Sequence, residues 1–285
     1  MKRKISLFIY ILLAGLTVLF YACDKEKVIQ VGGIDEKNDY ETFSTSAYND
    51  VCDNYVFAEY PVTGDKPYLD SVKSWINAVL SVNPFSEYMQ IEKINAKDKD
   101  IPALLEHYTN AKLVEIKDSV IADRIKTTKN KYYCKDSINI TYKGDNIVSF
   151  VCKRKYFTGN IHGLNSQYSA VFDKKTGKRY GWEIIEKKDV LRDMIIESLL
   201  QYFKIEDKDA LTKVLFVNNL SELPLPEQPP YFLENGMTLQ YSQHEIAPYS
   251  AGTPYVTIAW NKLKDILTSE ATDVLSSDIS RYTNE

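Results

Sequence analysis

The sequence predicts an α+β fold in which antiparallel sheets pack against helices, arranged as two small domains in tandem. Two apolar patterns recur along the 285 residues: alternation with polar residues, typical of half-buried strands, and a spacing of three to four residues, typical of helices. They follow one another without the regular strand–helix–strand order of a parallel sheet. With 44% hydrophobic and 26% charged residues, the composition is that of a globular protein rather than of a disordered or fibrous one.

The first 22 residues have the pattern of a bacterial lipoprotein signal peptide. Lys2-Arg3-Lys4 precedes an apolar run at 5–20, which is short for a membrane span, and Ala22 stands directly before Cys23. The resemblance implies cleavage before Cys23 and a lipid on its sulfur. We therefore expect a lipoprotein held at the membrane of the cell envelope, facing either the periplasm or the cell surface.

Residues 23–46 are polar and contain Gly32-Gly33, so we expect a flexible tether. Its charged start at 24–27 resembles an export signal that places some lipoproteins on the cell surface. Removing the three basic residues of the signal from the total of 35 leaves 32, against 39 acidic residues, a net charge of −7. Since no basic patch dominates the sequence, we expect no nucleic-acid partner.

The N-terminal α+β domain is expected at residues 47–178. Pro67 suits the first turn of a helix that starts near Asp65, with Val72 and Trp75 among its apolar positions. The other expected elements are a strand at 47–62, a helix at 101–123, a hairpin at 132–157, and a strand at 165–172 with a turn at 173–177.

The expected hairpin turns at Gly144-Asp145-Asn146, and a three-residue loop sets its register. The apolar residues of both strands then lie on the same face of the hairpin. The predicted cross-strand pairs are Ile138 with Cys152, Ile140 with Phe150, and Tyr142 with Val148.

The same register bears on the cysteines. Cys134 falls opposite Tyr156, roughly 13 Å from Cys152, which is too far for a disulfide. Because Cys23 would carry lipid, any disulfide would involve Cys52. The alternative is that all three remaining cysteines are buried free thiols.

The C-terminal α+β domain is expected at residues 179–270, followed by a polar tail at 271–285. Asn235-Gly236 is the strongest two-residue turn signal in the chain. The expected elements are a helix at 187–204, a proline-rich connector at 224–230, a hairpin at 231–246, a strand at 255–258 and a helix at 261–267.

Two motifs carry a resemblance. Residues 155–163 read Lys-Tyr-Phe-Thr-Gly-Asn-Ile-His-Gly, followed by Tyr-Ser-Ala-Val-Phe-Asp at 168–173 and Thr-Gly-Lys at 176–178. Residues 245–252 read Glu-Ile-Ala-Pro-Tyr-Ser-Ala-Gly before the last expected strand and helix. Both resemble motifs of an extracytoplasmic bacterial family of two linked domains of unknown function.

Members of that family form the outer portion of a lysozyme-sensing anti-sigma factor, accompany some peptidoglycan deacetylases, and occur as stand-alone lipoproteins. The resemblance also implies that the C-terminal part is similar to a subdomain of the Hsp70 ATPase. The sequence has no counterpart of the anti-sigma factor's transmembrane helix or of the deacetylase's metal-binding domain, so we expect neither sigma-factor control nor zinc ligands. It also lacks a phosphate-binding loop, and fold alone does not give function.

The candidate ligand-binding residues are His162, Tyr156, Tyr168 and Tyr249. His162 lies between flexible glycines, where it can contact a ligand or cap backbone groups of the loop. The tyrosines combine an apolar ring with a polar hydroxyl, which suits a binding face, although many tyrosines simply cover sheets. Phe157, Trp182 and Tyr255 would extend this face if the fold gathers them, although core packing is the favoured role for Phe157 and Trp182.

No catalytic residue, metal or cofactor is expected. His107, His162 and His244 fall on separate elements, which disfavours zinc. Ser250, His162 and Asp173 could form a hydrolase triad on paper, but Ser250 lacks the leading glycine of a nucleophile elbow. The segment 246–252 is more simply a sharp corner, since Pro248 fixes one dihedral angle and Gly252 permits a positive one.

These observations favour a non-enzymatic, lipid-anchored binding module that recognises a protein or glycan at the cell envelope. The resemblance implies a lysozyme-like protein or peptidoglycan as the ligand, and the net charge of −7 suits a basic partner such as lysozyme. Two alternatives remain open: an envelope hydrolase or metal-dependent enzyme acting on cell-wall material, and a structural or assembly lipoprotein.

Overall fold

The computed structural model describes residues 31–33, 39–115, 123, 125–127, 130–159 and 162–283. The expected signal peptide and Cys23 lie outside the described residues. No helix in the described ranges is long and apolar enough to cross a membrane. The expected α+β class is confirmed, with one sheet of seven strands, one sheet of three, and helices packed against both.

The large sheet contains the first seven strands in chain order, and only the β3–β4 pair is parallel. The strands are β1 (Val31–Gly33), β2 (Tyr40–Tyr48), β3 (Cys52–Pro61), β4 (Tyr132–Lys143), β5 (Ile147–Phe157), β6 (Leu164–Asp173) and β7 (Arg179–Tyr180). Residues 40–46 therefore belong to the sheet and not to the expected tether. The expected strand at 47–62 is likewise the end of β2, a turn and β3.

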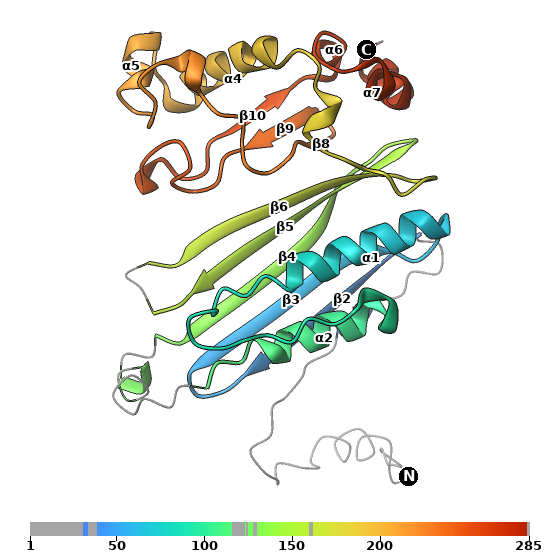
Figure 1. Cartoon of the computed structure of the whole chain (residues 1–285), viewed down its shortest axis with the longest axis vertical. Helices are drawn as coiled ribbons and strands as arrows, with labels where there is room; N and C mark the ends of the chain where they lie inside the picture. The colour runs from blue at the N-terminus through green and yellow to red at the C-terminus, as the bar shows by residue number, and fades with distance from the viewer. Residues whose placement is uncertain are drawn as a thin grey trace, which may run out of the picture.

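A crossover between β3 and β4 carries α1 (Lys66–Leu80), the 3-10 helix η1 (Ala96–Asp98) and α2 (Ile101–Ala111). Pro67 occupies the first turn of α1, as predicted. Figure 1 shows α1 and α2 on one side of the large sheet, and their buried side chains form one cluster with those of β3 to β6. Residues 112–115 are not helical, so the helix expected at 101–123 is shorter than predicted.

The hairpin β4–β5 departs from the predicted register at one point. Ile138 pairs with Cys152 and Ile140 with Phe150, as expected, but Tyr142 pairs with Ser149. The shift between Ile140 and Tyr142 is a β-bulge, in which one extra residue is accommodated in β4. Tyr142 consequently leaves the helix-covered face and packs with the second unit.

The second unit, called here the C-terminal unit, comprises residues 181–283. Its strands are β8 (Tyr231–Leu233), β9 (Gly236–Gln240) and β10 (Tyr255–Ile258), in the order β10-β9-β8. Its longer helix is α4 (Lys188–Phe203), and the shorter ones are η2 (Trp182–Ile184), α5 (Lys208–Thr212), η3 (Leu220–Glu222), η4 (Tyr249–Ala251) and α6 (Trp260–Leu263). The hairpin turn is Glu234-Asn235, because Gly236 already pairs with Leu233.

Residues 271–283 are not a polar tail. They belong to α7 (Ser269–Val274) and α8 (Ser276–Thr283) and to the connection between them. Ala271, Leu275 and Ile279 are buried in the core. Their spacing of four residues forms a narrow apolar stripe, which the polar composition of the segment conceals.

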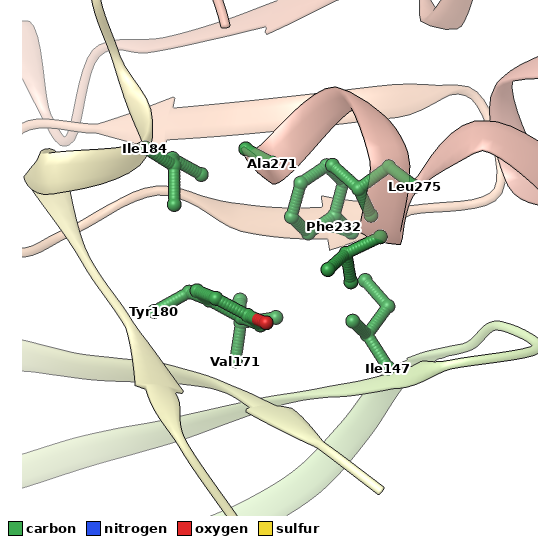
Figure 2. Close-up of a pocket in the computed structure, with 8 residues that line it drawn as sticks. Ile147, Val171, Tyr180, Ile184, Phe232, Ala271 and Leu275 are labelled. Carbon is green, nitrogen blue, oxygen red and sulfur yellow. The ribbon is translucent and has the colours of Figure 1, made fainter. Parts of the chain in front are cut away.

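The C-terminal unit packs against the face of the large sheet opposite α1 and α2 (Figure 1). Figure 2 shows the apolar contact, in which Ile147, Val171 and Tyr180 of the large sheet face Phe232 and Leu275. One hydrophobic cluster therefore continues from the large sheet into the C-terminal unit.

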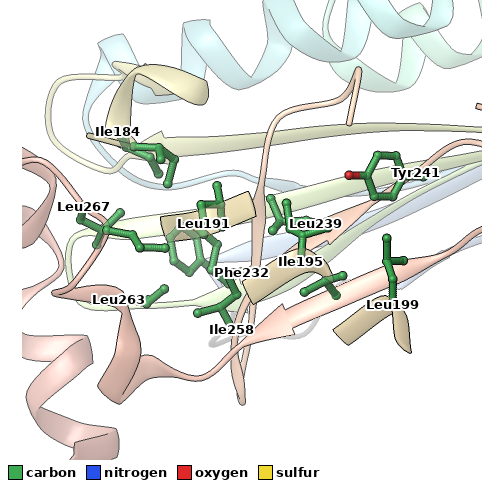
Figure 3. Packing of buried hydrophobic residues seen from close by; sticks show 14 of the residues in the cluster. Ile184, Leu191, Ile195, Leu199, Phe232, Leu239, Tyr241, Ile258, Leu263 and Leu267 are labelled. Carbon is green, nitrogen blue, oxygen red and sulfur yellow. The ribbon is translucent and has the colours of Figure 1, made fainter. Parts of the chain in front are cut away.

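Inside the C-terminal unit, α4 covers the three-stranded sheet. Leu191, Ile195 and Leu199 recur along the helix at the spacing of one face. They pack in the same cluster as Leu239 and Ile258 (Figure 3). An apolar layer therefore joins α4 to the three-stranded sheet.

All three described cysteines are free and buried. Cys134 lies opposite Tyr156, so the prediction that Cys134 and Cys152 do not pair is confirmed. Cys52 pairs with Tyr132 across the parallel strands, two positions away from Cys134. The alternative of three free thiols therefore holds, and no disulfide involves Cys52.

Candidate binding site

The structure brings two of the four candidate residues to one face of the large sheet. Tyr156 and Tyr168 both point to the side covered by helices, because their positions in the β5–β6 register share the alternation of Cys152. Arg154 lies between them, with Cζ 5.4 Å from the centroid of the Tyr168 ring. Both rings are half-buried, and burial raises the pKa of Tyr168. Tyr168 packs against the Arg154 guanidinium, whereas Tyr156 packs against the apolar cluster that contains Cys52 and Cys134.

His162 is exposed in the loop between β5 and β6. It lies at the opposite end of β6 from Asp173, a distance of about 30 Å for an extended strand of this length. The Asp173 carboxylate instead accepts bonds from Lys175 and Thr176 in its own turn. A triad of Ser250, His162 and Asp173 is therefore incompatible with the fold.

Tyr249 belongs to a different region, in the C-terminal unit. It is 50% exposed, and its ring stacks on that of His244 with centroids 4.4 Å apart and an interplanar angle of 8°. Phe216, which is 53% exposed, meets the His244 ring edge-on, with the ring centroids 5.1 Å apart. His244 lies in a turn with a φ of 68° and not in the strand expected at 231–246. Such a conformation is uncommon outside glycine and marks a locally constrained backbone.

The corner at 246–252 connects this stack to two further rings. Pro248 precedes η4, and Gly252 has a φ of 71°, as the architectural interpretation of the segment predicted. The Tyr202 hydroxyl donates to the carbonyl of Ala251 at 2.9 Å, and the Tyr202 ring meets that of Tyr255 at 5.9 Å. Tyr255 is 55% exposed. We call this connected group the aromatic surface; its residues are Tyr202, Phe216, His244, Tyr249 and Tyr255.

Behind Tyr168 lies a buried ion triad that sequence reasoning missed. Arg154 donates to both carboxylate oxygens of Asp136, from Nε at 2.5 Å and Nη2 at 3.0 Å, and Lys112 Nζ donates to Asp136 at 2.9 Å. All three residues are 1% exposed. The sequence did contain a signal for this triad. Asp136 and Arg154 occupy inward-facing positions of their alternating strands, where a charged side chain needs a partner.

Two helix ends help to balance the excess positive charge of the triad. Arg154 donates to the carbonyls of Val79 and Val82 at the end of α1, at 3.0 and 2.9 Å. Lys112 is the residue that closes α2. The carbonyl ends of helices carry partial negative charge, which favours cations. Burial alone would raise the pKa of Asp136, but the charges of Lys112 and Arg154 hold it below its usual value.

The thiols next to the triad are protonated at neutral pH. Burial is the main cause, and it raises the pKa of Cys52 and of Cys134 to about 11 each. A buried, protonated thiol is a poor nucleophile. Among the residues that the structure describes, no group of three or more His, Cys, Asp or Glu side chains is placed to hold a metal ion.

Comparison with known proteins finds one family model that is similar to part of the C-terminal unit. Residues 183–261 match a family described as a protein of unknown function (DUF3298). This range contains every residue of the aromatic surface. No curated protein matches the chain.

Two solved structures share the fold across almost the whole chain. A crystal structure of a DUF3298 family member from Bacteroides fragilis is 17% identical, with a TM-score of 0.59, and the match covers 92% of this chain and 98% of that chain. A DUF3298 family protein from Pseudomonas aeruginosa is 12% identical, with a TM-score of 0.52 and coverage of 87% and 97%. At these identities the likeness establishes the shared fold.

Proposed function

We propose that this protein is a lipid-anchored binding module of the bacterial cell envelope. It recognises a protein or glycan ligand, with a lysozyme-like protein or peptidoglycan as the candidates. The anchor rests on the signal-like pattern that ends at Cys23. The candidate ligands rest on the two motifs that resemble the envelope family, and the match of residues 183–261 is consistent with that resemblance.

The observation that carries the proposal is the aromatic surface. Phe216, Tyr249 and Tyr255 are each at least half exposed, although burying such rings in the core would be favourable. Exposed aromatic groups that contact one another are typical of interaction surfaces, because they supply large contact area at a small cost in side-chain entropy. The positive φ of His244 and the corner at Gly252 hold these rings in place before a ligand binds.

Charge favours the lysozyme-like candidate. The chain without its signal has a net charge of −7 from the residue counts, and lysozyme is basic. Opposite net charges accelerate encounter and make binding sensitive to salt, whereas the rings supply the short-range contact. Binding is therefore expected to weaken as ionic strength rises.

The test is calorimetric titration of residues 24–285 with a c-type lysozyme, with soluble peptidoglycan fragments as a parallel arm. We expect saturable binding in one arm, weakened at least tenfold by Tyr249→Ala, because a ring at the centre of an interface contributes about 2 kcal/mol or more. Val190→Ala is the matched control, since it removes an apolar side chain that is 39% exposed outside the aromatic surface. Absence of heat in both arms would contradict the proposal.

A further inference from the structure

The large sheet leaves part of one face uncovered. The C-terminal unit contacts this face at the start of β5, where Phe232 donates its backbone N–H to Ser149, and along β6, where Ser169 donates to the carbonyl of Pro229. Towards the other end of the strands, Tyr48 and Tyr55 are 43% and 38% exposed. We call this uncovered region the open face; the residues that matter here are Tyr48, Tyr55, Tyr133, Lys135, Lys153 and Lys155.

The strand register places three lysines together on the open face. Lys135 of β4 lies directly opposite Lys155 of β5, and Lys153 follows on the same face two residues along the strand. All three are exposed. Like charges directly opposite one another destabilise a sheet, so folding alone gives no reason for this pair.

No carboxylate of a described residue neutralises these lysines. Within the described part of the chain, none of the three forms an ion pair with an acidic side chain. Asp53, the nearest acidic residue in the register, already pairs with Lys131 at 3.3 Å. The open face is thus locally basic in a chain whose formal net charge is −4. A local charge opposite to that of the whole molecule points to an anionic ligand.

Aromatic rings lie beside the lysines. Tyr55 is the register neighbour of Lys135 in β3, and Lys135 Nζ lies 5.6 Å from the centroid of the Tyr133 ring. Tyr48, Tyr55 and Lys135 line one open hollow together with Ser46 and Asp53. Tyrosine offers a flat apolar face with a polar tip, and a sugar ring likewise combines an apolar C–H face with a rim of hydroxyl groups.

From this arrangement we propose that the open face binds an acidic polysaccharide. Sugar rings stack on Tyr48 and Tyr55, and their carboxylates meet Lys135, Lys153 and Lys155. Adjacent strands separate the opposing lysines by about 5 Å, and successive positions along one strand face separate them by about 7 Å. Such spacing suits a polymer with one carboxylate on each sugar. A nucleic acid is a less suitable ligand. Its phosphates are closely spaced, and a protein with a negative net charge would need many more than three cationic side chains to bind it.

The open face and the aromatic surface are different sites, so the two proposals can fail separately. The C-terminal unit approaches the edge of the open face where Asn165 of β6 donates to Gln243 at 3.4 Å, next to His244. Lys155 pairs with Asn165 in the register, so the basic row ends at this contact. A long ligand on the open face would be guided towards the C-terminal unit, but binding at the open face does not depend on it.

The experiment is titration of residues 24–285 with polygalacturonate, with neutral dextran of similar length as the uncharged arm. We expect saturable binding of polygalacturonate and none of dextran. The double variant Lys135→Gln/Lys155→Gln should weaken binding at least tenfold and melt no lower than the wild type, since it removes a repulsion. The matched control is Lys262→Gln/Lys264→Gln, two exposed lysines of the C-terminal unit, which should change affinity less than twofold.

A further arm separates sugar recognition from simple attraction to polyanions. Tyr55→Ser should weaken polygalacturonate binding at least threefold and leave the weaker binding of polyglutamate, which has no sugar rings, unchanged. The proposal is overturned if polygalacturonate does not bind, or if the control pair weakens binding as much as the open-face pair. Equal affinity for polyglutamate or for a thymidine oligonucleotide would also overturn it, in favour of a general polyanion surface.

Discussion

The two faces of the large sheet are covered in chemically different ways. On the helix-covered face, a buried centre of three charges, Lys112, Asp136 and Arg154, lies under the ends of α1 and α2. On the other face, the contact with the C-terminal unit is an apolar cluster that includes the buried carboxylate of Asp278, which accepts a bond from the Tyr142 hydroxyl at 2.9 Å.

The difference follows from where the helices end. The crossover brings the carbonyl ends of α1 and α2 to the sheet, and unpaired carbonyls there need donors. Arg154 supplies two of these bonds, to Val79 and Val82, and Asp136 in turn compensates its charge. In the C-terminal unit α4 lies flat on its own small sheet, so apolar packing suffices (Figure 3). The stability of the helix-covered face should therefore depend on the buried charges, and the stability of the other face on the apolar area that it buries.

The largest expected effect is on the apolar face. Truncation after Thr268 removes α7 and α8, and we expect the free energy of unfolding to fall by about 5 kcal/mol or more, since burial of Leu275 and Ile279 contributes roughly 1.5–3 kcal/mol each and bonds to Asp278 are lost as well. Urea unfolding followed by tryptophan fluorescence measures the change. Ser280→Ala, at an exposed position of α8, is the control and should change little. Unchanged stability after truncation would restore the polar-tail interpretation.

The next effect tests the charged face. Asp136→Asn leaves Lys112 and Arg154 buried without a counter-charge, and we expect a loss of about 3–5 kcal/mol. Asp53→Asn breaks the partly exposed pair with Lys131 and should cost less than about 1 kcal/mol. Equal losses in the two variants, measured by urea unfolding, would show that burial of the triad has no energetic consequence.

The same carboxylate predicts a pH dependence. The folded state holds the pKa of Asp136 below its usual value, so its stabilising contribution is complete above the unfolded pKa of about 4 and is lost as pH falls through the lower folded value. The stability difference between the wild type and Asp136→Asn should therefore be constant from pH 5 to 7 and should shrink in stronger acid. A difference that grows below pH 4 would contradict this assignment.

The smallest expected effect concerns one polar bond within the apolar face, from the Tyr142 hydroxyl to Asp278. Burial and the neighbouring Asp278 carboxylate raise the pKa of Tyr142, so its hydroxyl remains a donor at neutral pH. Tyr142→Phe removes that donor, and we expect a loss of about 1–3 kcal/mol. Tyr282→Phe, whose hydroxyl bonds Glu234 in a solvent-exposed setting, should lose less than about 0.5 kcal/mol. Similar melting temperatures for both variants would contradict the role of Asp278.

Local patterns were sufficient for most elements. The expected strand at 255–258 coincides with β10, and the helix expected at 187–204 differs from α4 by one residue at each end. Both have regular apolar spacing and clear boundaries. The prediction of a polar tail was wrong. Three apolar residues spaced four apart indicate a buried helix face only when the rest of the fold offers an apolar surface for them to pack against. The predicted partner of Tyr142 was wrong because the alternation of polar and apolar residues in β4 does not indicate the β-bulge.

The sequence by itself determined the α+β class, most elements, and the separation of Cys134 from Cys152, because these depend on spacing along one strand or helix. Only the tertiary structure decided which side chains meet across elements. It brought Phe216 to His244 and Tyr202 to Tyr255, pairs that are distant in the chain. The physical reason is that periodicity specifies which face of an element is buried, whereas the crossover, the bulge and the packing of the two units specify what that face contacts.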